Sequence, residues 1–89
     1  MIYFRWGAGA DDEVLYLTSA DWMNRNMFGR IEVAWPVIDA ALRQRVIDEC
    51  LVPYLHDQRD AWQLGADGRY QRVAEAGVSA QQALMARYA

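Results

Sequence analysis

The spacing of apolar residues changes at Pro36, and this change constrains the fold more than any other feature of the sequence. Before it, apolar side chains occupy every second position, on one face of an extended strand: Ile31, Val33 and Trp35. After it, apolar side chains recur at the spacing of one helix face: Leu42, Val46, Ile47, Cys50 and Leu51. A strand pattern over residues 30–35 followed by a helix pattern predicts a mixed fold of the α+β class.

Two further strands are expected before this segment. Residues 2–6 and 13–19 are rich in β-branched and aromatic side chains, and a glycine-rich turn over residues 7–12 separates them. Residues 21–28 are polar and carry neither period, so we expect them to be irregular. The acidic run Asp11-Asp12-Glu13 is most simply a solvated turn, although three adjacent acids can also hold a weakly bound cation.

The helix after Pro36 has a start signal and a break signal. Asp39 is a suitable N-cap, because its carboxylate can accept a free N–H of the first turn. Pro53 lacks an N–H and clashes with the preceding turn, so it is expected to kink or end the helix near Val52. The helical pattern then resumes briefly through Tyr54 and Leu55.

The last third of the chain predicts a hairpin and a short helix. Residues 62–64 and 70–73 flank a turn containing Asp67-Gly68, and Asp-Gly is a strong hairpin signal. Ser79 and Gln82 have the spacing of a capping box. Three apolar side chains are expected to dock the helix that follows: Leu84, Met85 and Tyr88.

Together these elements predict one domain over residues 1–89. Its class is α+β: a small, mainly antiparallel sheet with a long helix packed on it, a C-terminal hairpin and a short final helix. A chain of 89 residues has a small core and no room for two domains. No stretch reaches the length needed to span a membrane.

Charge and cysteine content exclude several function classes. The net charge of −3 argues against nucleic-acid binding through a general positive field. Cys50 is the single cysteine, so an internal disulfide is impossible and a reduced, cytoplasmic location is expected.

The densest group of polar residues follows the second expected strand. A serine, an aspartate, two asparagines and two arginines occur within residues 18–32, called here the signature segment. Donors gathered at a strand end suit the oxygens of a phosphate group. The candidate phosphate-binding residues are Ser19, Asp21, Arg25, Asn26, Arg30 and Glu32.

This segment also carries a family resemblance. The run Ser19-Ala20-Asp21-Trp22-Met23, then Arg25-Asn26, Arg30 and Glu32, closely resembles a signature of bacterial polyphosphate kinases. The similarity continues through Tyr54-Leu55, Ala61, Leu64, Asp67-Gly68, Tyr70, Arg72, Gln81 and Leu84-Met85. The chain therefore resembles the C-terminal part of such an enzyme, which belongs to the phospholipase-D-like superfamily.

The resemblance implies a role in reversible transfer of the γ-phosphate of ATP to polyphosphate through a phosphohistidine. It implies ATP and Mg²⁺ as ligands of the parent enzyme, with no cofactor expected for the isolated chain. The implied partners are the rest of the kinase chain, polyphosphate and ATP, with no nucleic acid. It also implies a cytoplasmic enzyme, and peripheral membrane association of the parent enzyme stays open.

The catalytic histidines of that family fall outside the matching region, upstream of Met1. No residue of this chain is therefore assigned as catalytic, and the chain alone is expected to be inactive. His56 lies beside Asp57, and such a pair is imaginable as a nucleophile and its acid. Its place near a helix end instead favours a structural role.

Several residues keep a structural alternative. Ser19 can bond a nearby backbone group instead of lining a site, and Asp21 can cap its loop, which we prefer to metal binding. Arg25 and Arg30 can pair with Asp21 or Glu32 instead of phosphate.

Three functions remain open for the whole chain. It is part of a polyphosphate kinase, a stand-alone module that binds polyphosphate or nucleotide without catalysis, or an unrelated small interaction domain. Self-association is also expected, because residues 2–6 would form an open sheet edge beside apolar surface.

Overall fold

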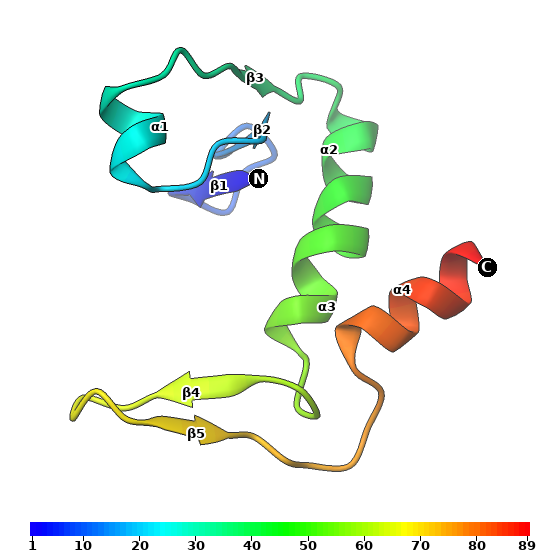
Figure 1. The fold of residues 1–89 in the computed structure, drawn as a ribbon. Helices are drawn as coiled ribbons and strands as arrows, with labels where there is room; N and C mark the ends of the chain where they lie inside the picture. The colour runs from blue at the N-terminus through cyan, green and yellow to red at the C-terminus, as the bar shows by residue number, and fades with distance from the viewer. The chain divides into compact units, whose positions relative to one another are not determined.

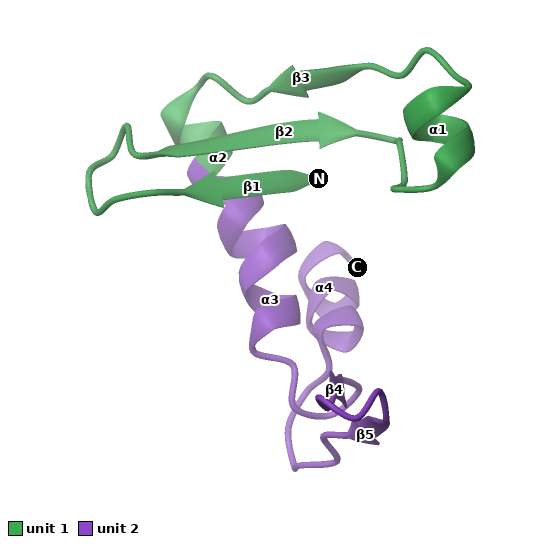
Figure 2. Cartoon of the chain, turned by 90° about the vertical axis from the view of Figure 1, so that its left-hand side faces the viewer, with its two compact units in different colours: residues 1–43 green, residues 44–89 purple.

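The computed structural model describes residues 1–89 and divides them into two compact units, residues 1–43 and 44–89 (Figure 2). Strands and helices are both present, so the predicted α+β class is confirmed. The assignment of the whole chain to one domain stays a prediction. No helix is long and apolar enough to cross a bilayer.

Unit 1 contains a three-stranded antiparallel sheet in the order β1-β2-β3 (Figure 1). The strands are β1 (Ile2–Arg5), β2 (Glu13–Thr18) and β3 (Ala34–Pro36). Phe4 pairs with Val14 across β1 and β2, and Leu17 pairs with Trp35 across β2 and β3. The first two predicted strands are confirmed, each shorter by its last residue.

The third strand is shorter than the alternation predicted. Residues 30–33 lie outside it, and Ile31 is 99% exposed, so the expected apolar face of Ile31 and Val33 is not buried within this chain. The reason is that β2 ends at Thr18, which pairs with Ala34, and leaves no partner for the residues before Ala34. The strand ends at Pro36, where the apolar spacing changes, and Pro36 itself is tolerated as its last residue because an edge strand needs no N–H on its free side.

Residues 21–28 were predicted to be irregular, and this prediction was wrong in part, because Asn24–Phe28 form the short helix α1. Backbone N–H groups of Asn26 and Met27 both donate to the carbonyl oxygen of Met23, at 2.9 and 3.0 Å. No apolar period marks this helix, which is why the sequence pattern missed it.

The long helix runs without interruption over residues 40–55, as α2 (Ala40–Val46), a π-helical turn (Ile47–Leu51) and α3 (Val52–Leu55). The Asp39 cap is confirmed, because its Oδ1 accepts the Leu42 N–H at 2.8 Å. Pro53 does not end the helix. The turn before it widens, and the Val52 N–H bonds the Ile47 oxygen, which accommodates the missing N–H at Pro53.

The wide turn also affects which side chains of the apolar stripe are buried. Ile47 is 7% exposed, whereas Leu42 and Cys50 are exposed. One extra residue in the turn rotates the positions after it away from a straight helical stripe, which accounts for the exposure of Cys50 but not for that of Leu42, which precedes the turn.

Unit 2 also contains the predicted hairpin, formed by β4 (Trp62–Leu64) and β5 (Tyr70–Arg72). Gly68 has φ of 80°, a conformation that favours glycine and explains the Asp-Gly signal. Val73, expected in the second strand, lies outside it.

The final helix α4 (Ala80–Tyr88) is held by polar contacts at both ends, because Arg87 and Tyr88 in its last turn donate to the buried Glu49 carboxylate. Ser79 caps it, accepting the Gln82 N–H at 3.2 Å, and Ser79 and Ala80 are each 2% exposed. The second half of the capping box is absent, because the Gln82 side chain instead accepts from Arg59. Apolar docking was wrongly predicted for Met85 and Tyr88, which are 72% and 57% exposed. Tyr88 instead contacts the chain through its hydroxyl, which donates to Glu49.

Candidate phosphate-binding site

The signature segment begins where β2 ends, as predicted. The Ala20 N–H donates to the Thr18 hydroxyl at 3.2 Å, and the chain then turns into α1. Because α1 starts a few residues after the strand, side chains from the loop and from the helix lie together.

Asp21 and Asn26 lock this loop to the helix. The Asp21 Oδ1 atom accepts the Met23 N–H at 3.2 Å and also the Asn26 Nδ2 group, which reaches the Asp21 carbonyl oxygen at 3.4 Å as well. Asn26 is 6% exposed, although asparagine is usually a surface residue. Asp21 thus acts as a loop cap, the structural alternative that the sequence favoured.

The two arginines are attached to this lock in different ways. Arg30 Nη1 donates to Asn26 Oδ1 at 3.3 Å. Arg25 Nη2 lies 3.8 Å from Asp21 Oδ2, and both side chains are more than half exposed. Such a long, exposed ion pair contributes little free energy, so the Arg25 guanidinium is available to another anion.

Ser19 and Glu32 are not part of the lock. Ser19 is exposed and its hydroxyl makes no hydrogen bond within the chain. Glu32 lines a cavity of about 180 Å³ together with Thr18, Trp22 and Met27. The structure therefore brings four of the six candidate residues into one network: Asp21, Arg25, Asn26 and Arg30.

A second charged network surrounds Glu13, and the sequence reading missed it. Glu13 belongs to β2, not to a solvated turn, and its side chain is 7% exposed. The Tyr3 hydroxyl donates to its carboxylate at 2.7 Å, and Arg5 and Arg43 pair with it at 3.1 and 3.2 Å. The Tyr3 hydrogen bond, with help from Arg43 and Arg5, holds the pKa of the Glu13 carboxyl below its usual value. The register between β1 and β2 places Arg5 opposite Glu13, and this pairing is the signal from which the Glu13 network could have been predicted.

Asp57 is a further carboxylate with a structural role. It accepts the backbone N–H groups of Ala80, Asp60 and Arg59 at 2.8, 2.8 and 2.9 Å, and these bonds lower the pKa of its carboxyl. His56, the C-cap of α3, is exposed and makes no side-chain hydrogen bond with Asp57. The imagined nucleophile pair is therefore not formed.

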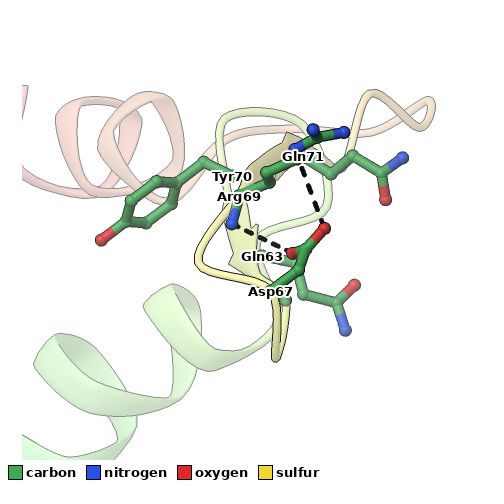
Figure 3. Close-up of a pocket in the computed structure, with 6 residues that line it drawn as sticks. Gln63, Asp67, Arg69, Tyr70 and Gln71 are labelled. Carbon is green, nitrogen blue, oxygen red and sulfur yellow. Dashed lines mark hydrogen bonds and ion pairs between the residues drawn. The ribbon is translucent and has the colours of Figure 1, made fainter.

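The hairpin carries a hollow of about 370 Å³, lined by Gln63, Gly65, Asp67, Arg69, Tyr70 and Gln71 (Figure 3). The Arg69 N–H donates to Asp67 Oδ1 at 3.1 Å, and its guanidinium lies 3.9 Å from Asp67 Oδ2. Every lining residue is exposed. Arg69 therefore forms a long, exposed ion pair with an aspartate, as Arg25 does, but it lies outside the signature segment.

Comparison with known proteins identifies the family. Residues 2–84 match the family described as Polyphosphate kinase C-terminal domain 2. The chain belongs to this family. The resemblance noted in the sequence is thereby confirmed, and the signature segment lies inside the matched residues.

Individual relatives agree with the family match. Over 71 residues, 80% of this chain, it is 51% identical to the polyphosphate kinase of Burkholderia lata and 49% identical to that of Burkholderia cenocepacia, covering 10% of each. It is 42% identical over 78 residues to the polyphosphate kinase of Paraburkholderia phytofirmans, covering 85% of the chain and 11% of that enzyme. The chain thus spans about a tenth of these relatives. No solved structure matches it.

Proposed function

We propose that the chain forms one wall of the phosphate-transfer site of an ATP:polyphosphate phosphotransferase, with the phosphohistidine supplied from outside residues 1–89. The observation that carries this proposal is the Asp21–Asn26 lock, which fixes α1, the helix that carries Arg25, and bonds the Arg30 side chain at one strand end. Membership of the polyphosphate kinase family supports it.

In this proposal Arg25 contacts the transferred phosphate or the polyphosphate chain. Its guanidinium is 64% exposed and only weakly paired, so it can make charge-assisted hydrogen bonds to anionic oxygens. A positive charge at this position stabilises negative charge that develops during transfer. Asp21 and Asn26 are positioning residues, because they act on phosphate only through the arginines.

Arg30, Ser19 and Glu32 have smaller roles in the proposal. Arg30 is held by Asn26 and adds positive charge beside Arg25. Ser19 offers a free hydroxyl to a phosphate oxygen. Glu32 lines the neighbouring cavity and limits the approach of further anions.

Mg²⁺ and ATP are proposed only for the parent enzyme. No group of three or more His, Cys, Asp or Glu side chains in this chain is placed to hold a metal ion. The Asp21 carboxylate already meets Asn26, the Met23 N–H and Arg25. These residues do not fit a metal site, so no step is assigned to Mg²⁺ here, whereas the arginines fit the phosphates of ATP.

The test uses the Burkholderia lata enzyme carrying residues 2–84 of this chain in place of its matched region. Arg25→Ala should lower kcat/KM for polyphosphate formation about 30-fold, for a loss of about 2 kcal/mol from one charge-assisted contact. Arg69→Ala is the matched control, because it removes a similar exposed ion pair, and it should change the rate less than twofold. Equal kinetics for the two variants would remove Arg25 from the site.

A further inference from the structure

The register of the sheet in unit 1 separates its side chains into two faces, because cross-strand partners point to the same side. One face carries Leu15, which is 0% exposed, and Glu13 with its arginine and tyrosine partners. The other face, called here the open face, carries Ile2, Phe4, Val14, Tyr16, Thr18, Ala34 and Pro36.

The open face is apolar and incompletely covered. None of its residues is fully buried, and Phe4 is 55% exposed. The cavity of about 180 Å³ opens at its end, where Ile2 and Ala34 meet Trp22 and Met27. Trp22 is 79% exposed and Met27 46%, so they extend the apolar surface beyond the strands.

The charges of the sheet are all on the opposite face. Arg5 and Glu13 pair with each other across the strands, and no strand residue of the open face is charged. Glu32, outside the strands, is the charged residue in the lining of the adjoining cavity. Absence of charge with several aromatic residues is typical of the buried centre of a permanent interface. A sheet with one apolar face uncovered requires a second layer.

The length of the relatives indicates what that layer is. The chain spans about a tenth of each polyphosphate kinase, so nine-tenths of such an enzyme is further polypeptide joined covalently to this region. A covalently joined segment has a high effective concentration, which favours it over any separate partner.

We infer that the open face is the surface on which the remainder of the polyphosphate kinase chain packs, through an apolar segment. The inference rests on the proposal that this chain works as part of a larger kinase. Docking there holds the strand end of β2, and therefore the signature segment, against the rest of the enzyme.

The test is hydroxyl-radical footprinting of the isolated chain and of the Burkholderia lata enzyme carrying residues 2–84. The radical dose is calibrated with a free reporter peptide. Oxidation of Phe4, Trp22 and Met27 should fall at least fivefold in the whole enzyme and should not depend on enzyme concentration. A graft of residues 2–43 alone keeps the test available if the larger graft misfolds.

Two results would overturn the inference. Oxidation of Phe4 within twofold of that in the isolated chain would show that the face stays open. Protection that appears in the isolated chain and grows with its concentration would assign the face to a second copy.

Footprinting measures the protection of side chains and does not require the enzyme to be active. Its result is therefore independent of the kinetic test of Arg25→Ala. Protection of Phe4 in an enzyme unaffected by Arg25→Ala would refute the proposed site and leave the docking surface standing.

Discussion

The lock between Asp21 and Asn26 gives the sharpest prediction for this chain. Asn26 is 6% exposed; its Nδ2 group donates to two oxygens of Asp21, and its Oδ1 accepts from Arg30. Asn26→Ala removes three hydrogen bonds, two of them to charged groups. At about 1 kcal/mol net for each bond, the local opening free energy should fall by about 3 kcal/mol.

The assay is hydrogen exchange over residues 20–30, followed by mass spectrometry. A loss of about 3 kcal/mol corresponds to roughly 100-fold faster exchange of protected amides. Asn24→Ala is the matched control, because Asn24 is exposed in the same helix and its side chain makes no hydrogen bond. If the two variants exchange at the same rate, the lock does not hold the segment.

Three further predictions concern stability. Ser79→Ala should cost about 1 kcal/mol in chemical denaturation because it removes the cap of α4, whereas Ser19→Ala should stay within about 0.5 kcal/mol; equal losses would contradict the cap. The lowered pKa of Glu13 means that its network stabilises the fold above the unfolded value of about 4.3 and that this contribution is lost as pH falls through the folded value. The urea concentration at the midpoint of unfolding should therefore decrease once the pH is below about 4. Glu13→Gln should make this decrease smaller, and an equally large decrease in the variant would refute the network. Gly68→Ala should cost about 1–2 kcal/mol from backbone strain alone, since an added Cβ meets no atom within 4 Å; a neutral result in thermal unfolding would show that the turn relaxes.

Local signals explain the parts of the fold that the sequence predicted. Asp39 and Ser79 cap their helices through bonds within a few residues, and Asp67-Gly68 forms its turn through the positive φ of Gly68. Such features depend on neighbours in the chain, so they can be recognised without knowledge of the packing.

Features that depend on distant residues were missed. The burial of Glu13 requires Arg43, thirty positions away, and the exposure of Ile31 follows from where β2 ends. The wide turn before Pro53 is an adjustment of the backbone that no apolar period reveals.

The candidate site shows the same division. Residue types and their order in the signature segment identified the family, and the comparisons confirmed it. The distinction between the locked Asn26 and the available Arg25 came only from hydrogen-bond geometry.

The most direct test of the central claim is arginine modification by phenylglyoxal in the Burkholderia lata enzyme carrying residues 2–84. The claim predicts that saturating polyphosphate slows modification of Arg25 at least tenfold and leaves Arg69 unchanged. Modification of Arg25 at the same rate with and without polyphosphate would contradict the claim that this segment lines the phosphate site.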